Sequence, residues 1–285
     1  MRVVRRSEEL RSLLDERRRK GLTVGLVPTM GALHAGHLSL VRRARHLSDV
    51  VVVSVFVNPR QFGEGEDFEH YPRDTEGDLE LLRGERADIA FLPSVEDMYP
   101  AGATVRVTAG SIGDFYEGAD RPGHFDGVCT VVTKLFNIVE PDLAVFGQKD
   151  AQQTAVLKRL VRDLDFGIDL VIGPIVRESD GLAISSRNVY LAAEQRNQAL
   201  ALSRSLELGR DAFARSTDAQ LAEKAMLEYL QVADGIEVAY AAAVDPETFE
   251  APRTEDRILL IVAGRVGNTR LIDNLVVDAT DGGGG

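Results

Sequence analysis

The sequence lacks two marks of an exported protein. It has a single cysteine, Cys129, and no Asn-x-Ser/Thr sequon. One cysteine cannot form an intrachain disulfide bond, which fits a reducing, intracellular compartment. The heavily charged segment from Ser7 to Lys20 also leaves no apolar core for a signal peptide. We therefore expect a cytoplasmic protein in which Cys129 acts as a small buried hydrophobic residue.

Long apolar runs and an excess of positive charge are also absent. The run from Val50 to Val57 is far shorter than the roughly 18 residues needed to cross a bilayer. Lys and Arg total 33 against 45 Asp and Glu, for a formal net charge of -12. Proteins that bind nucleic acid or anionic membranes usually present a basic surface. The sequence therefore predicts no membrane and no nucleic-acid partner, although a local basic pocket for one nucleotide is compatible with this charge.

Apolar β-branched runs alternate with helical stretches through the first two thirds of the chain. Nearly continuous apolar runs are typical of strands buried on both faces of a sheet. Alternation of strands and helices favours a parallel sheet, so the predicted fold class is α/β with a Rossmann-like doubly wound sheet. The expected strands are Thr23–Val27, Val50–Val57, Ile89–Leu92, Leu143–Phe146 and Asp169–Ile172. The expected helices are His37–Leu47, Thr75–Arg83, Val128–Val139 and Asp150–Leu164.

The pattern changes after Asn188, where two helical stretches precede three strands. Helices followed by strands, without alternation, indicate a smaller α+β domain. A chain of 285 residues also commonly divides in two. We therefore expect a Rossmann-like domain over residues 1–175 and a C-terminal α+β lid domain over residues 176–285. Its expected elements are Ala193–Arg215, Asp218–Gln231, Ile236–Val244, Ile258–Val266 and Thr269–Val277.

Both common phosphate motifs, Gly-x4-Gly-Lys-Ser/Thr and Gly-x-Gly-x-x-Gly, are missing. Ligands of doubly wound sheets bind beyond the carboxyl ends of the strands. There, a segment from Pro28 leaves a strand, contains Gly31 and Gly36, and enters a helix near His37. A helix N-terminus attracts anions, glycines let the backbone approach phosphate, and His34 and His37 add donors. The segment therefore predicts a phosphate site that differs from both of these motifs.

Two alternatives stay open for the two histidines of this loop. They can lie together by chance on a helix-capping turn. A zinc site would need further ligands, and Cys129, His46, His70 and His124 have no metal-site spacing. We predict no metal site built from protein side chains.

Two further loops carry cations at the same edge of the predicted sheet. Gly147–Asp150 offers Lys149 to phosphate and Asp150 to ribose or magnesium, with a solvated charge and a helix cap as the alternatives. Ile184–Arg187 supplies two hydroxyls and a guanidinium that suit several phosphate oxygens.

Neutral amides follow the second and fourth main strands. Asn58, Gln61 and Gln153 can hydrogen-bond a substrate hydroxyl and a carboxylate together. Ordinary turn chemistry and a solvated helix face are the alternatives. The polar segment Gly63–Tyr71 is predicted to be a mobile lid.

Five segments resemble the signatures of the pantothenate synthetase family, in that family's order. This family belongs to the nucleotidyltransferase superfamily, whose hallmarks include a His-x-Gly-His (HxGH) loop. The segments are Val27–His37, Phe56–Gly63, Arg121–Phe125, Phe146–Asp150 and Asp180–Asn188.

The resemblance implies a pantoate–β-alanine ligase that works in two steps. Pantoate attacks the α-phosphate of ATP, bound with Mg2+, to give pantoyl adenylate and pyrophosphate. β-Alanine then attacks the adenylate, releasing pantothenate and AMP. The resemblance also implies a homodimer whose other partners are these small molecules alone.

The same resemblance assigns roles to individual residues. The implied catalytic groups are His34, His37, Lys149 and Arg187, and pantoate and β-alanine are expected at Asn58, Gln61 and Gln153. The implied ATP-binding residues are Met30, Gly31, Ala32, Leu33, His34, Ala35, Gly36, His37, Gly147, Gln148, Lys149, Asp150, Val176, Ile184, Ser185, Ser186 and Arg187.

Two positions depart from the family pattern. Ala151 stands where an aromatic residue is common, and Asp126 where a basic residue is frequent. We expect the first to alter packing rather than chemistry. A plain nucleotidyltransferase and a non-enzymatic ATP-binding regulator remain alternative functions, although Gln61 and Gln153 favour a small hydroxy-acid site.

Overall fold

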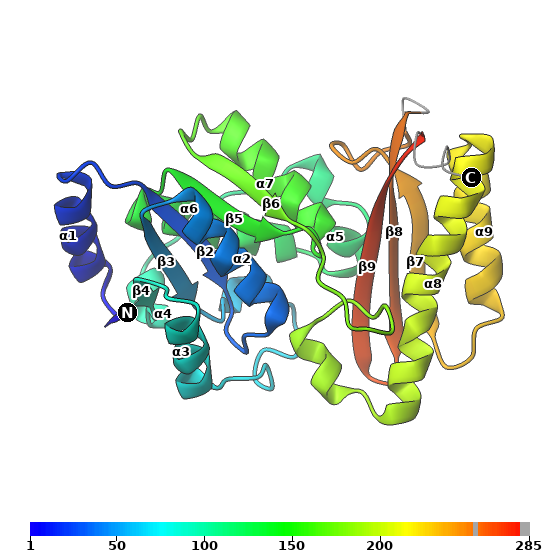
Figure 1. Ribbon diagram of the computed structural model, residues 1–285, viewed down its shortest axis with the longest axis horizontal. Coiled ribbons are helices and arrows are strands. Elements are labelled where there is room, and N and C mark those ends of the chain that lie inside the picture. The colour runs from blue at the N-terminus through cyan, green and yellow to red at the C-terminus, as the bar shows by residue number, and fades with distance from the viewer. Residues whose placement is uncertain (253–255, 280–285) are drawn as a thin grey trace. The chain divides into compact units, whose positions relative to one another are not determined.

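Residues 1–252 and 256–279 are described by a computed structural model (Figure 1). The chain forms two compact units. The first consists of residues 1–147 and 152–174, and the second of residues 148–151 and 175–285. The expected boundary after residue 175 lies next to this division, but the short segment 148–151 was not expected in the second unit. None of the helices in the described ranges has both the length and the apolar character needed to cross a membrane.

The first unit contains a six-stranded sheet in the order β1-β4-β3-β2-β5-β6, and every paired strand is parallel. Its strands are β1 (Arg2–Val4), β2 (Val24–Thr29), β3 (Val50–Val55), β4 (Ile89–Phe91), β5 (Leu143–Gly147) and β6 (Asp169–Gly173). Its helices are α1 (Ser7–Arg18), α2 (Ala35–Leu47), η1 (Pro59–Gln61), α3 (Thr75–Gly84), α4 (Val95–Met98), η2 (Ser111–Gly113), α5 (Glu117–Asp120), α6 (His124–Val139) and α7 (Ala151–Asp163). The expected α/β fold class is confirmed.

Both faces of this sheet are buried. Val51 and Val53 of β3 belong to one hydrophobic cluster with Leu40 and Val41 of α2. Val52 lies between them, is also fully buried, and points to the opposite face because side chains alternate along a strand. Burial on both sides explains why the strands have almost no polar residues.

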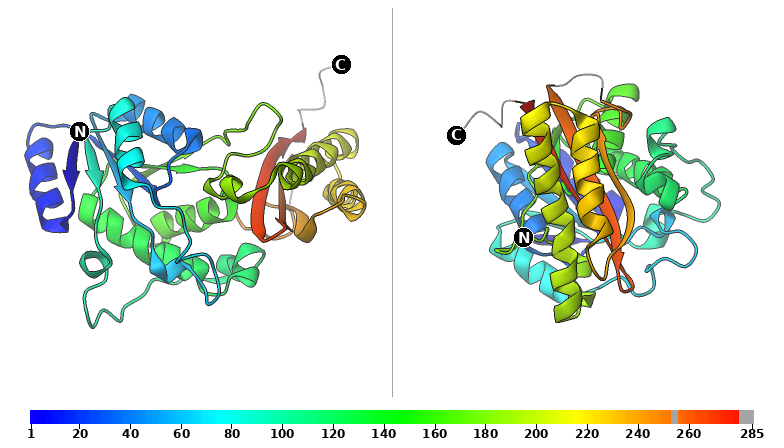
Figure 2. Two further views of the ribbon diagram at one scale, coloured as in Figure 1. Left: turned by 90° about the horizontal axis from the view of Figure 1, so that it is seen from below. Right: turned by 90° about the vertical axis from the view of Figure 1, so that its right-hand side faces the viewer.

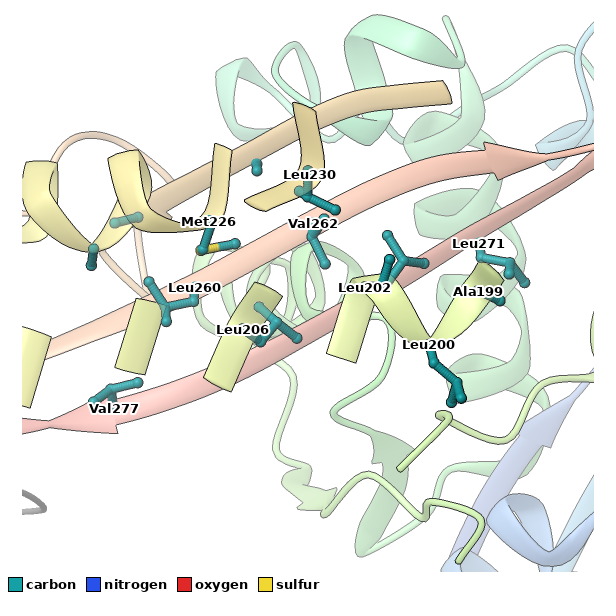
Figure 3. Packing of buried hydrophobic residues seen from close by; sticks show 14 of the residues in the cluster. Ala199, Leu200, Leu202, Leu206, Met226, Leu230, Leu260, Val262, Leu271 and Val277 are labelled. Carbon is teal, nitrogen blue, oxygen red and sulfur yellow. The ribbon is translucent and has the colours of Figure 1, made fainter. Parts of the chain in front are cut away.

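The second unit packs two long helices on a three-stranded antiparallel sheet (Figure 2). Leu206 of α8, Met226 of α9 and Leu260 of β8 meet in its core (Figure 3). A Cβ on Gly209 would lie 2.8 Å from the Met226 side chain, so the missing side chain lets α8 and α9 approach. The elements are η3 (Ser186–Tyr190), α8 (Ala193–Ser216), α9 (Ala219–Gln231), β7 (Glu237–Val244), β8 (Arg257–Val266) and β9 (Thr269–Asp278).

Several element boundaries differ from the sequence predictions. Helix α2 begins at Ala35, two residues before the expected His37, so His34 is its N-cap. Helix α6 begins at His124 rather than Val128. Strand β1 and helix α1 were not predicted. Cys129 is buried and free, as expected, and burial raises the pKa of its thiol to about 12.

Candidate active site

The topology of the six-stranded sheet predicts a ligand site at the carboxyl ends of β2 and β5. Strand β2 pairs with β3 on one side and with β5 on the other, so the order of the strands reverses between β2 and β5. Such a switch point is where doubly wound sheets bind ligands. The loop after β2 holds the paired histidines, and β5 ends at Gly147.

Asp78 of α3 holds the loop that follows β2. Gly31 and Ala32 both have left-handed backbones, with φ of 84° and 49°. The N–H of Ala32 donates to Asp78 Oδ2 (3.0 Å), and the N–H of Leu33 donates to Asp78 Oδ1 (2.7 Å). A Cβ on Gly31 would lie 2.9 Å from Asp78 Oδ2, so glycine is required by both conformation and space. The two amides anchor the loop on a carboxylate of its own unit.

Asp78 is a buried acid, with 4% of its surface exposed. Burial raises the pKa of its carboxyl group, and the two backbone donors oppose that shift. The sequence predictions did not identify Asp78, because a carboxylate three residues into a helix is usually a solvated helix-start charge.

His34 and His37 form a close ring pair at the start of α2. Their ring centroids lie 4.0 Å apart, with an interplanar angle of 31°. A Cβ on Gly36 would come within 3.0 Å of the His34 ring, so Gly36 allows this ring to fold over the first turn. Two imidazoles therefore meet where the first N–H groups of a 13-residue helix begin. This is an arrangement that suits an anion.

Asn58 is the N-cap of η1 and Gln61 is the last residue of that helix, and both are buried. Asn58 Nδ2 donates to Gln61 Oε1 (3.0 Å) and to the Gly127 carbonyl (3.1 Å). Asn58 Oδ1 accepts from the Tyr99 hydroxyl (2.8 Å) and from the Arg60 N–H (3.2 Å). Both donors and both acceptor positions of this amide are thus engaged within the protein.

The Gln61 amide reaches the histidine loop. Its Nε2 donates to the Met30 sulfur at 3.2 Å. A thioether is a weak acceptor, so this contact brings Gln61 to the loop after β2 without binding its N–H strongly. The structure therefore brings Met30 and Gln61 together, two residues that the sequence assigned to ATP and to pantoate.

A cluster of polar and charged side chains fixes the main chain at Gln61. His124 Nδ1 donates to the Gln61 carbonyl (2.8 Å), since a carbonyl can only accept, and Arg121 Nη2 donates to the same oxygen (3.3 Å). Arg121 also forms two hydrogen bonds with Glu66 (2.9 and 2.7 Å). Burial, with a smaller effect from Arg121, lowers the pKa of His124 to about 4, so this imidazole is neutral at pH 7.

Two neighbouring glutamines on α7 have different surroundings. Gln152 is buried, accepts from the Glu117 N–H (3.1 Å) and donates to the Ile112 and Phe115 carbonyls. Gln153, the residue expected at the substrate site, is half-buried. The first glutamine supports structure, and the second retains access to solvent.

The structure shows the surroundings of the two residues that depart from the family pattern. Asp126 Oδ1 accepts the Ala109 N–H at 2.8 Å, so this carboxylate holds an exposed segment before η2. Ala151 is buried with 6% of its surface exposed, and lies at the first position of α7.

The remaining predicted residues belong to the second unit. Lys149 is half-buried and Asp150 is exposed. The Val176 carbonyl accepts a hydrogen bond from the Ile184 N–H at 3.0 Å, which brings Val176 close to the Ser-Ser-Arg turn. Ser185 Oγ accepts the Arg187 N–H at 3.2 Å and caps η3. The residues 148–150, 176 and 184–187 thus share one unit, whereas Met30–His37, Asn58, Gln61, Gly147 and Gln153 share the other.

Together, the fold and the site define a class, namely a doubly wound α/β protein with two imidazoles at the first turn of a helix and buried amides on a neighbouring loop. A family model described as pantoate-beta-alanine ligase matches residues 2–276. The pantothenate synthetase of Thermotoga petrophila is 51% identical over 279 residues, covering 97% of this chain and 100% of that protein. That of Rubrobacter xylanophilus is 51% identical over 282 residues, covering 95% and 97%. The chain belongs to the pantoate–β-alanine ligase family, which confirms the resemblance.

Solved structures give the same result. Pantothenate synthetase from Thermus thermophilus has a TM-score of 0.91 and 48% identity, covering 96% of this chain and 99% of that chain. Pantoate-beta-alanine ligase from Francisella tularensis, complexed with beta-gamma ATP and beta-alanine, has a TM-score of 0.79 and 33% identity, covering 97% of each chain.

Proposed function

We propose that this chain is an enzyme that condenses (R)-pantoate with β-alanine, using ATP and releasing AMP and pyrophosphate. The match of the family model to residues 2–276 carries the proposal. The paired imidazoles at a helix start and the buried amide at Gln61 support it, because the first suit a phosphate and the second a hydroxy acid.

The first step forms the acyl adenylate. A carboxylate oxygen of pantoate attacks the α-phosphorus of ATP, the bond to the bridging oxygen breaks, and pyrophosphate leaves. The proposed role of His34 and His37 is to stabilise charge that grows on the phosphate oxygens. Lys149 and Arg187 are the proposed cations for the remaining oxygens. The reaction needs no protein nucleophile, so catalysis rests on position and charge.

The second step forms the amide. The amine of β-alanine attacks the carbonyl carbon of the adenylate, the bond from that carbon to the phosphate oxygen breaks, and AMP leaves as the nitrogen loses a proton. Water would destroy the intermediate, so we assign the segment Gly63–Tyr71 and the smaller domain the role of lids.

Gln61 is the proposed contact for pantoate. A substrate carboxylate or hydroxyl oxygen is a stronger acceptor than the Met30 thioether that its Nε2 meets. Asn58 orients Gln61 in this proposal, because its own donors and acceptors are already engaged. Gln153 offers a second amide from α7.

Magnesium is proposed to enter with ATP. Within residues 1–252 and 256–279, no group of three or more His, Cys, Asp and Glu side chains is arranged to hold a metal ion. Phosphate oxygens and waters are the usual ligands of Mg2+ in such sites, together with one or two carboxylates, for which exposed Asp150 is available. When bound, the ion neutralises part of the phosphate charge.

A homodimer in the cytoplasm is the proposed state of the enzyme. Val105 is 84% exposed and Phe115 is 45% exposed, on the segment that Asp126 and Thr130 hold at Ala109 and Val107. Contact with a second copy of the chain would remove these two apolar side chains from water. Light scattering should give about twice the chain mass of 31.1 kDa, and Val105→Glu should give monomers. A monomeric wild-type protein would refute this part of the proposal.

One assay tests the reaction. The protein is incubated with magnesium ATP, pantoate and β-alanine, and AMP, pyrophosphate and pantothenate are measured together. With magnesium ATP and pantoate but no β-alanine, the protein should release at most one pyrophosphate per active site. Addition of β-alanine should then start multiple turnovers. Continuous AMP formation without β-alanine would contradict the ligase reaction and favour a plain nucleotidyltransferase.

A further inference from the structure

The side chain of Asn274 joins strand β9 to the segment that carries Lys149. Asn274 is 2% exposed. Its Nδ2 donates to the Gln148 carbonyl (3.0 Å) and to the Lys149 carbonyl (2.9 Å). Gln148 Nε2 donates back to Asn274 Oδ1 (3.1 Å). One buried amide therefore binds two consecutive peptide groups and a side chain.

These contacts account for an unusual feature of the chain. Residues 148–151 lie between β5 and α7 in the sequence, yet they belong to the second unit. The hydrogen bonds from Asn274 join residues that are 126 and 125 positions apart in the sequence, and they hold this segment on β9. The backbone of Lys149 is thus fixed by the second unit.

The preceding residue of β9 holds another loop of the same unit. Asp273, 4% exposed, accepts two hydrogen bonds from Arg177 (2.6 and 2.9 Å). The same guanidinium donates to the Gly181 carbonyl (3.0 Å) and to the Asn274 carbonyl (3.3 Å). Adjacent residues of one strand therefore anchor the segment of Lys149 and the loop that connects Val176 to the Ser-Ser-Arg turn.

We propose that Asn274 is a positioning residue for adenylation, which acts by fixing the backbone of Lys149 so that its ammonium group meets the phosphates of ATP. This inference rests on the proposed function. Lysine has a flexible four-carbon side chain, so the reach of its ammonium depends on where the backbone is held. Displacement by about 1 Å is enough to reduce a rate by about 10²-fold.

A double-mutant cycle tests whether Asn274 acts through Lys149. Pyrophosphate release is measured in single turnovers with ATP and pantoate for wild type, Asn274→Ser, Lys149→Ala and the double variant. Asn274→Ser should lower kcat/KM for ATP by about 10²-fold in the wild-type background and by less than about 3-fold when Lys149 is already absent. An equal fold-change in both backgrounds would overturn the inference, because it would indicate a structural role only.

Matched variants separate positioning from folding. Asn274→Asp keeps the size of the side chain but removes the two donors. It replaces Asn274→Ser in the double-mutant cycle if the serine variant does not melt cooperatively. Asp245→Ala serves as the control, since Asp245 accepts the Glu247 and Thr248 N–H groups (2.9 Å each) at a turn of the same unit and alanine removes that acceptor. This control should lower the melting temperature and leave the adenylation rate unchanged.

The outcomes distinguish this inference from the proposed function. Wild-type protein that forms no pantothenate would overturn both. Wild-type protein that forms pantothenate while Asn274→Asp retains full kcat/KM for ATP would overturn only the role of Asn274. Loss of adenylation in both Asn274 variants, with coupling to Lys149, is the expected result.

Discussion

At the scale of single residues, the two imidazoles of the first β–α turn have unequal positions. His34 is the N-cap of α2, and its ring lies over Gly36. His37 lies in the first turn, and the proposed function assigns one anion to its side chain and the helix N-terminus together. We expect His37→Ala to slow adenylation by about 10²-fold or more, as loss of a preorganised donor does in other enzymes.

Single-turnover pyrophosphate release measures this effect. His46→Ala is the matched control, since His46 lies exposed in the last turn of the same helix. An unchanged rate in His37→Ala would remove this residue from the mechanism.

Asp78 holds the backbone of the same loop. Removing its carboxylate leaves the Ala32 and Leu33 N–H groups without their acceptor, which costs about 1–3 kcal/mol for each buried group. We expect Asp78→Ala to lower the free energy of unfolding by that order and to raise KM for ATP. Asp74→Ala is the control, because Asp74 caps the same helix through Gly77. Urea unfolding and steady-state kinetics should show a loss of stability of about 1 kcal/mol in that control, with KM unchanged.

At the scale of elements, the contact between α6 and η1 requires a glycine. A Cβ on Gly127 would lie 2.1 Å from the Arg60 carbonyl oxygen, so Gly127→Ala must displace the short helix that carries Gln61. We expect a loss of about 1–3 kcal/mol, as overpacking usually gives, together with a higher KM for pantoate.

Gly84→Ala provides the contrast to that substitution. A Cβ at Gly84 has no atom within 4 Å, and the residue ends α3. Alanine there should be neutral or stabilise by up to about 1 kcal/mol. Equal effects of the two substitutions on stability and KM would contradict the packing argument.

The elements that the sequence predicted are those with a continuous apolar pattern. Val50–Val55 and Leu143–Gly147 contain little besides buried residues, so their apolar runs identified them clearly as strands. Strand β1 has three residues and begins with an arginine, which gives no detectable period. The start of α2 was misjudged because its N-cap is His34, which is not among the usual capping residues.

The loops of the candidate site could be predicted from the sequence, but the residues that hold those loops by hydrogen bonds could not. The histidine loop and the Gln61 turn follow strands, so the sheet rule located them. Asp78 contacts the histidine loop from 45 residues away in the sequence, and Asn274 contacts the segment of Lys149 from 125 residues away. No local pattern encodes such distances, and each residue alone resembles an ordinary polar position.

At the scale of the whole molecule, His124 should make the protein sensitive to acid. Burial lowers its folded pKa to about 4, against about 6.5 in an unfolded chain. Below pH 6.5 the unfolded state binds the proton first, so stability falls as the pH decreases from 6.5 towards 4. The difference corresponds to about 3 kcal/mol. Arg121, Glu66 and Glu117 face this ring and modify the shift.

Urea unfolding at pH 7 and pH 4 tests this linkage. Asparagine can donate to the Gln61 carbonyl but does not titrate, so His124→Asn should lose less stability than wild type over this interval. His46→Asn changes an exposed histidine and should follow the wild-type profile. A His124→Asn profile parallel to that of wild type would contradict the assignment.

The segment 148–151 has a consequence for how the protein can be divided. The chain passes between the two units after Gly147, after Ala151 and after Pro174. A fragment that starts at Ile175 would therefore lack Gln148 and Lys149 and would leave the buried amide of Asn274 without those partners. Neither unit is a contiguous gene segment, so a cut at one peptide bond cannot yield two intact folding units. Recombination between relatives should succeed only when it exchanges the short segment together with β9.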